Sequence, residues 1–415
     1  MPRAFDFDAD AIVAGAGPAG AAAARALARA GLDTLLVDRA AFPRNKPCGG
    51  GVSIRALVRF DWLDQAIAGI DVHRISKLHL EGPGGAVLDI DHAEPCIFLI
   101  RRVAFDAALV DAARGAGARF DNLEITQASQ DDEGVTLQAR DGRRLRAPVV
   151  VAADGVHSVI AKRLGVNARW PRSAIALDMM EETPVATLAA LRPDVLWVAY
   201  AHQGLDGYGY VFPKTDHVNV GVGCLLSHFD ETISASPYEV QQAFVASLVA
   251  RGALRGRSDR SRFTPYLIPV GGPLADAWSG RVLFAGDAGG FVHAITAEGI
   301  YYAMVSGELA AAAIAAERHD PSRAGRAYAR SWRREIGAEL SDAVLLQRYF
   351  FSQHDRVGRV VGGAGAAPGF VDLILEYAKG RLSYASLRRR LLLRFPSTMW
   401  QIARERLSAP DQRAS

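Results

Sequence analysis

The sequence predicts an α/β protein with a Rossmann-type dinucleotide-binding domain, an inserted antiparallel β-rich domain and a C-terminal helical region. Three observations predict it: a strand–glycine loop–helix–strand unit opens the chain, later strands end at Asp154 and Asp287, and strand-like stretches fill residues 75–100 and 166–274. The composition agrees, because 50% of the 415 residues are hydrophobic and 22% are charged, which favours packed cores over disorder.

The opening unit, residues 9–38, carries a G-x-G-x-x-G loop between a short buried strand and an alanine- and leucine-rich helix. Gly15 permits the tight turn, Gly17 lets backbone N–H groups approach a pyrophosphate, and Gly20 lets the helix pack closely on the strand. Asp38 ends the second strand, where its carboxylate can accept hydrogen bonds from ribose hydroxyls. The unit therefore predicts a dinucleotide site at the helix N-terminus.

Two later segments favour FAD over NAD. Residues 148–158 form a strand that runs into the Asp-Gly pair at Asp154, and residues 281–290 form a strand that ends in Gly-Asp at Asp287. A carboxylate there suits the hydroxyls of a ribityl chain, and a helix that begins near Gly299 would direct its N–H groups at the flavin edge. In this order the three elements resemble the FAD-binding domain shared by aromatic hydroxylases and their relatives.

Further segments narrow the resemblance. Residues 46–52 read K-P-C-G-G-G-V, Arg102 opens a helix, residues 208–214 read Y-G-Y-V-F-P-K, and residues 290–304 follow the Gly-Asp pair. Over roughly residues 8–320 the chain resembles the geranylgeranyl reductase family of FAD-dependent oxidoreductases. The K-P-C-G-G and aromatic F-P elements are the specific parts of that resemblance.

The resemblance implies a set of FAD-binding residues at the positions that match the family: Ala19, Asp38, Cys48, Gly49, Gly50, Arg102, Asp287, Gly299 and Ile300. The candidate cofactor-binding set is completed by the fingerprint and D-G residues Gly15, Gly17, Gly20, Arg39 and Asp154. Cys48 matches a cysteine near the flavin ring. Tyr208, Phe212 and Pro213 match an aromatic motif that lines the isoprenoid pocket.

The chain departs from the family pattern at two positions. The family motif usually reads Y-x-W-x-F-P, and here Tyr210 replaces its tryptophan. This change bears on the chain length or the head group of the substrate. Ala297 stands where the family has the second residue of T-G-E-G, and its methyl group lies where a backbone approaches closely.

The expected domain organisation is discontinuous. The FAD-binding domain is expected over residues 1–72, 100–165 and 275–330. The β-rich substrate domain, inserted twice, is expected over residues 73–99 and 166–274. The C-terminal helical region is expected over residues 331–415. Residues 362–369, G-G-A-G-A-A-P-G, are interpreted as a flexible connection and not as a second nucleotide loop.

The resemblance implies a reductase that saturates isolated C=C bonds of a geranylgeranyl or other polyprenyl group by hydride transfer from reduced flavin. Its catalytic candidates are Cys48, Tyr208, Tyr210 and Phe212, and the proton source stays open between Cys48, a tyrosine and water. Without a second nucleotide fingerprint, NAD(P)H or ferredoxin is expected as a transient electron donor. The alternatives are a flavin-dependent monooxygenase of an aromatic or apolar substrate and a non-catalytic FAD protein; the W-x-W-x-I motif of flavin halogenases is not found.

Other features limit the partners. A net charge of +3 does not indicate nucleic acid, and three cysteines without a CxxC pair and scattered histidines predict no metal site. The first strand begins too early for a signal peptide, so a cytoplasmic location is expected. Residues 387–407 mix arginines with Leu, Phe and Trp; they predict either a packed helix pair broken at Pro396 or contact with the inner face of a membrane.

Overall fold

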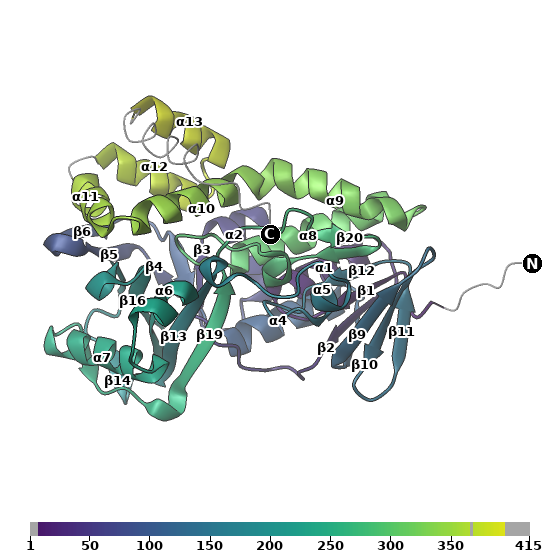
Figure 1. Cartoon of the computed structure of the whole chain (residues 1–415), viewed down its shortest axis with the longest axis horizontal. Helices are drawn as coiled ribbons and strands as arrows, with labels where there is room; N and C mark the ends of the chain where they lie inside the picture. Colours follow the sequence, from purple (N-terminus) through teal and green to yellow (C-terminus); the bar gives the residue numbers. More distant parts are fainter. Residues whose placement is uncertain (1–6, 366–367, 395–415) are drawn as a thin grey trace, which may run out of the picture.

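The computed structural model describes residues 7–365 and 368–394. Its two largest sheets have six and seven strands. In Figure 1 the sheet that contains β1 (Ala11–Ala14) lies on the right, the sheet that contains β13 (Ile175–Pro184) on the left, and the C-terminal helices along the top. This arrangement confirms the predicted fold class: an α/β dinucleotide-binding fold, an inserted sheet and a helical end.

The six-stranded sheet is parallel except at one edge, and its strand order is β20 (Trp278–Ser279), β21 (Val282–Phe284), β12 (Val150–Ala152), β1 (Ala11–Ala14), β2 (Thr34–Asp38) and β8 (Arg119–Asn122). Val13 and Leu36 face a core that also contains α1 (Pro18–Arg29), α4 (Arg102–Gly115) and α8 (Ile300–Ala316). Ile12 and Val37 face the opposite core, against the small sheet of β9 (Ile125–Gln130), β10 (Val135–Ala139) and β11 (Arg144–Ala147). Burial on both faces explains the continuous apolar run of β1.

The seven-stranded sheet has the order β19 (Phe263–Pro269), β13 (Ile175–Pro184), β17 (His217–Leu225), β16 (Gly207–Pro213), β15 (Val195–Tyr200), β5 (Lys77–Gly82) and β6 (Ala86–Asp91). Its neighbours are antiparallel except for the parallel pair β5–β15. Met179 and Val220 pack with Phe244 of α7 (Pro237–Ala250) on one face. The opposite face of this sheet lines the cavity of the candidate active site.

The remaining strands form two small sheets. β3 (Gly51–Ser53), β7 (Ile97–Leu99) and β4 (His73–Ile75) form one, and β14 (Leu188–Ala190) and β18 (Leu254–Gly256) form the other. The first of these joins the segments 1–72 and 73–99, which the sequence assigns to different domains.

The C-terminal helices are α9 (Ala324–Trp332), α10 (Ala338–Phe351), α11 (His354–Gly365), α12 (Pro368–Ala378) and α13 (Tyr384–Arg394). Residues 362–365 lie in α11, so the interpretation of this glycine-rich stretch as a flexible connection is wrong there. A helix with so many glycines is held by packing: Val357 and Val361 are buried, and a Cβ on Gly358 would lie 2.6 Å from the Pro83 carbonyl oxygen. Pro396 and the rest of the expected amphipathic segment beyond Arg394 lie outside the described residues.

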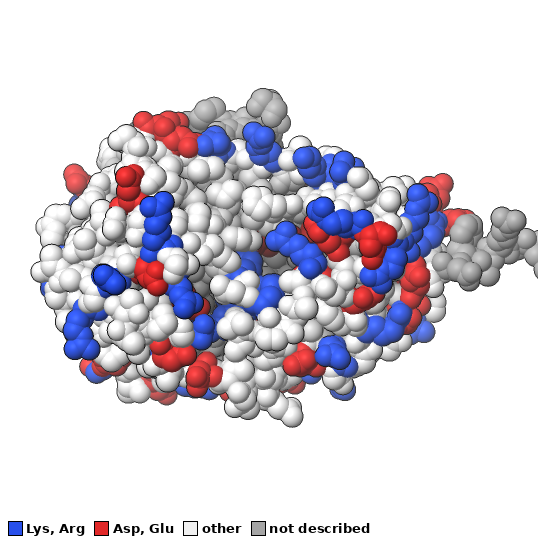
Figure 2. All heavy atoms as spheres, turned by 90° about the horizontal axis from the view of Figure 1, so that it is seen from below, with Lys and Arg blue, Asp and Glu red and all other residues white. Residues whose placement is uncertain are grey.

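On the face shown in Figure 2, Lys and Arg side chains lie among Asp and Glu side chains. Ion pairs of this kind occur among the described residues: Arg143 pairs with both Asp121 and Asp141. Within the described ranges, no single helix combines the length and the apolar composition needed to cross a bilayer, although the bent pair His354–Ala364 and Gly369–Ala378 does so jointly by those two criteria.

Candidate active site

A cavity of about 780 Å³ lies between the two large sheets and reaches α12. Its lining contains nearly all the residues that the sequence predicts for the site: Gly15, Gly17, Ala19, Asp38, Arg39, Cys48, Gly49, Gly50, Arg102, Asp154, Tyr208, Tyr210, Phe212, Asp287, Gly299 and Ile300. Gly20 and Pro213 are not among the lining residues. The volume lies in the range of ordinary ligand pockets.

The glycine loop between β1 and α1 has the geometry of a phosphate site. Gly15 has φ +98°, and a Cβ on Gly20 would lie 1.7 Å from the Gly15 carbonyl oxygen, so side chains are excluded at both positions. A Cβ on Gly17 would meet only Arg44 at 3.8 Å, which leaves this backbone open to the cavity. Helix α1 has no side-chain cap and no acidic residue in its first turn. Its N–H groups and partial positive charge can therefore meet a pyrophosphate.

Asp38 holds this loop in place. Its two carboxylate oxygens accept hydrogen bonds from the backbone N–H groups of Ala16 (2.7 Å) and Ala40 (2.8 Å). Each oxygen keeps a second lone pair for a ribose hydroxyl. Arg39 and Arg44 line the same end of the cavity and supply positive charge.

Arg102 is buried and forms a bidentate pair with Asp106, with donor–acceptor distances of 2.6 and 2.7 Å. Arg44 reaches the same carboxylate at 3.0 Å. Burial lowers the pKa of the Arg102 guanidinium, but Asp106 and Cys48 outweigh burial and hold it above its ordinary value. The structure thus brings Arg102 and Cys48 together at the cavity wall.

Asp154 has a structural role that the sequence did not reveal. Its Oδ2 accepts a hydrogen bond from the Ile160 N–H (3.2 Å) at the start of α5 (Val159–Arg163), while its Oδ1 is buried and has no partner among the described residues. Burial raises the pKa of this carboxyl, against the hydrogen bonds from Ser158 and Ile160. An unpartnered buried acceptor that lines the cavity fits a ligand hydroxyl.

The opposite end of this half of the cavity is formed by the turn that carries Asp287 and by the N-terminus of α8, where Gly299 is the N-cap residue and no side chain caps the helix. Lys46 extends over it: its Nζ lies 4.0 Å from Asp287 Oδ2 and 4.1 Å from the ring centre of Tyr266. Ala297 has φ +51°, a left-handed conformation that favours glycine. The glycine loop, the partnerless Asp154 oxygen and the uncapped start of α8 together fit an FAD.

The facing wall is aromatic. Tyr208, Tyr210 and Phe212 alternate along β16 and point to one face of the seven-stranded sheet, where they cluster with Leu196 and Val198 of β15. The sequence predicted this alternation, and the structure confirms it. Apolar residues of β5 and α12 extend the wall: Leu78, Leu80, Ile374, Leu375 and Ala378.

Cys48 lies where the two halves meet. It is half-buried, and the Gly50 N–H donates to its Sγ at 3.4 Å. A Cβ on Gly49 would lie 2.8 Å from the Phe212 ring, so the glycines after Cys48 let this loop lie directly against the aromatic wall.

Sequence reasoning missed Asp178. It lies in the apolar first half of strand β13, it lines the cavity, and it is 7% exposed. Tyr210 donates a hydrogen bond to its carboxyl group, with Oη 3.2 and 3.3 Å from the two oxygens. The signal was present in the sequence as A-L-D-M-M, a single acid within a run of apolar residues.

Comparison with known proteins also indicates an FAD-binding protein. A family model described as an FAD binding domain matches residues 8–336. A menaquinone reductase of Mycobacterium tuberculosis is 30% identical over 333 residues, which are 74% of this chain and 76% of that protein. The chloroplastic geranylgeranyl diphosphate reductase of Oryza sativa is 30% identical over 70% of this chain and 63% of its own length. A geranylgeranyl diphosphate reductase of Synechocystis is 29% identical over 78% of this chain and 81% of that protein.

Solved structures show the fold. A geranylgeranyl bacteriochlorophyll reductase-like protein from Thermoplasma acidophilum superposes with a TM-score of 0.76 at 20% identity, over 95% of this chain and 98% of that one. A flavin-dependent brominase superposes with a TM-score of 0.71 at 18% identity, over 90% and 93%. By the matched model, the relatives and the site, the chain belongs to the FAD-binding-domain family and is an FAD-dependent oxidoreductase of the geranylgeranyl reductase family.

Proposed function

We propose that the protein saturates isolated C=C bonds in a polyprenyl group. The observation that carries the proposal is the continuity of the cavity, in which an FAD-fitting half with Asp38 and Asp287 opens onto an aromatic and aliphatic wall. An isoprenoid chain has no polar groups to recognise, so its binding depends on such a wall. Geranylgeranyl diphosphate and menaquinone, for which relatives are named, share this chain chemistry.

Bound FAD, once reduced, supplies the hydride. Residues of the chain then have three tasks. The wall of Tyr208, Tyr210 and Phe212 positions the double bond and excludes water. If positive charge develops on the alkene, each aromatic face stabilises it by roughly 0.5–2 kcal/mol. A proton must reach the second carbon. NAD(P)H or ferredoxin is proposed to deliver the electrons.

The test is an anaerobic reaction of the purified holoprotein, reduced with dithionite, with geranylgeranyl diphosphate. Mass spectrometry of the product should show successive gains of two hydrogens. An unchanged substrate would contradict the proposal. A product that contains oxygen, formed only in air, would instead indicate a monooxygenase.

Cys48 gives a second test. Cys48→Ala should keep bound FAD, because the glycine loop, Asp38 and Asp154 are unchanged, but it should lose much of the turnover. Flavin absorbance and the rate of product formation measure the two effects. Unchanged turnover would remove Cys48 from the mechanism.

A further inference from the structure

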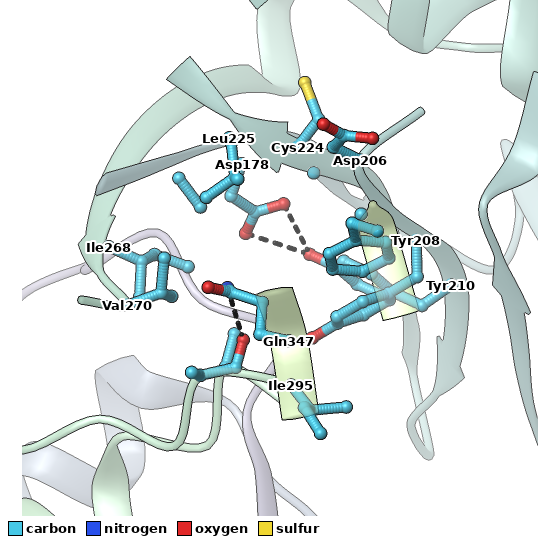
Figure 3. A pocket seen from close by; sticks show the side chains of 16 residues that line it. Asp178, Asp206, Tyr208, Tyr210, Cys224, Leu225, Ile268, Val270, Ile295 and Gln347 are labelled. Atoms are coloured by element: carbon cyan, nitrogen blue, oxygen red, sulfur yellow. Dashed lines mark hydrogen bonds between the residues drawn. The ribbon is translucent and has the colours of Figure 1, made fainter. Parts of the chain in front are cut away.

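The proton required by the reaction has to come from a group that is held at the cavity wall. Asp178 and Tyr210 lie side by side there, on strands β13 and β16, which flank β17 in the seven-stranded sheet. They are 7% and 4% exposed. Figure 3 shows both carboxylate oxygens directed at the Tyr210 hydroxyl. Because a phenol has one hydrogen, it serves the two oxygens in turn or receives a proton from one of them.

Other hydroxyl and thiol groups at the wall are placed differently. Tyr208 donates its hydrogen to the Thr296 carbonyl oxygen at 2.6 Å, so its proton already has an acceptor. Cys48 Sγ accepts a hydrogen bond from the Gly50 N–H, and no carboxyl group of the described residues hydrogen-bonds to it. Of the two tyrosines Tyr208 and Tyr210 on the aromatic wall, Tyr210 is thus the one that is hydrogen-bonded to a carboxyl group.

Asp178 is able to hold a proton near neutral pH. Burial raises its pKa to about 7, while the hydrogen bond from Tyr210 and the positive charge of Lys46 oppose the rise. A general acid works best when its pKa lies near the working pH. The titratable or charged groups around the pair are Lys46, Cys48, Asp206, Tyr208, Cys224 and Tyr266.

A second, smaller cavity reaches the same pair. Its volume is about 50 Å³, and Asp178, Tyr210 and Asp206 are among its lining residues (Figure 3). This volume is sufficient for water. Asp206 Oδ1 lies 2.7 Å from His354 Nε2 on the partly exposed side of the cavity. The small cavity therefore offers a route by which Asp178 regains a proton from solvent without passing through the substrate site.

We propose that Tyr210 and Asp178 are the proton-donating pair of the reaction, an inference that rests on the proposed function. Tyr210 Oη gives its proton to one alkene carbon and takes the proton of the Asp178 carboxyl. The other carbon receives the hydride, so the π bond breaks, two C–H bonds form and the flavin is oxidised by two electrons. Tyr210 ends unchanged, and Asp178 ends as a carboxylate that is reprotonated through the small cavity.

The experiment is a single turnover of the pre-reduced holoprotein with geranylgeranyl diphosphate, without oxygen, followed by flavin reoxidation across the pH range. The wild-type rate should fall as pH rises through about 7. Asp178→Asn and Tyr210→Phe should each lose about 100-fold or more of this rate. Both should keep their FAD and their reduction by dithionite. Tyr210→Phe retains the ring, so it stays informative if Asp178→Asn folds poorly.

Glu181→Gln is the matched control. Glu181 is another buried acid of β13, but it faces away from the cavity and binds Ser258 and the Asp259 N–H. It should keep the wild-type rate and pH profile. A wild-type rate that does not vary with pH, or wild-type turnover by Tyr210→Phe, would overturn the proton-donating pair. Failure of the wild-type protein itself to react with the substrate would overturn the proposed function instead.

Discussion

Replacing Asp178 with Asn should change how the stability of the protein depends on pH. Burial raises the pKa of this carboxyl to about 7 in the folded protein. In the unfolded chain an Asp titrates near 4. The folded protein therefore holds a proton that the unfolded chain has lost, and this contribution is fully present below about pH 4 and is lost as pH rises through about 7.

The size of the effect follows from the two pKa values. The difference between a pKa of about 4 in the unfolded chain and about 7 in the folded protein corresponds to about 4 kcal/mol of unfolding free energy. Of this, roughly 2–3 kcal/mol is lost between about pH 5 and about pH 8. Asn does not ionise, so the Asp178→Asn variant lacks this contribution. The free energy of unfolding of the wild type, minus that of the variant, should fall by this amount between the two pH values.

Urea unfolding of both proteins at saturating FAD measures the difference. Tyr210→Phe provides a second reading, because it removes the hydrogen bond that lowers the pKa of Asp178 and so should move the pH window upward. A difference between wild type and Asp178→Asn that is equal at both pH values would refute the reasoning, since it would mean that Asp178 titrates like an exposed acid.

Three further predictions concern stability. Gly221→Ala would place a Cβ 2.5 Å from the Tyr210 ring; it should cost about 1–3 kcal/mol in urea unfolding and lower turnover. Ala297→Gly relieves a left-handed conformation at φ +51°, and a net gain of up to about 1 kcal/mol should raise the melting temperature. Arg55→Met leaves Glu339, which is 4% exposed, without its buried cation and should cost about 3–5 kcal/mol of unfolding free energy.

Control substitutions at other positions test the first and the third of these predictions. Gly363→Ala in α11 meets nothing within 4 Å and should not destabilise. Arg59→Met breaks pairs with Glu308 and Glu335 that are about one-third exposed and should cost roughly 1 kcal/mol or less. Equal losses in a variant and its comparison, or a lower melting temperature for Ala297→Gly, would contradict the corresponding argument.

The dinucleotide half of the protein could be predicted from the sequence because its signals are local. Gly15 and Gly20 are required by backbone contacts within one βαβ unit, and Asp38 follows them at a fixed spacing. The period-two pattern of Tyr208, Tyr210 and Phe212 likewise placed three side chains on one face of a strand.

The rest depends on contacts between distant segments. Asp178 becomes part of the wall only because β13 and β16 flank β17 in one sheet, an order that no local pattern specifies. Considered from the local sequence alone, the glycines of α11 predict an interruption of the helix. Packing of α11 against Pro83 and β5 stabilises the helical conformation instead. Ile374 contributes to the cavity because α12 returns over it from the end of the chain.

The central claim is that FAD and an isoprenoid chain occupy one continuous cavity, with the reacting double bond at the aromatic wall. A crystal structure of the reduced holoprotein, grown without oxygen with a slowly reacting polyprenyl diphosphate analogue, tests it most directly. We expect the chain to lie along Tyr208, Tyr210 and Phe212, with one double bond between the flavin ring and the Tyr210 hydroxyl. A chain bound elsewhere on the protein, with water filling the space beside that wall, would contradict the account.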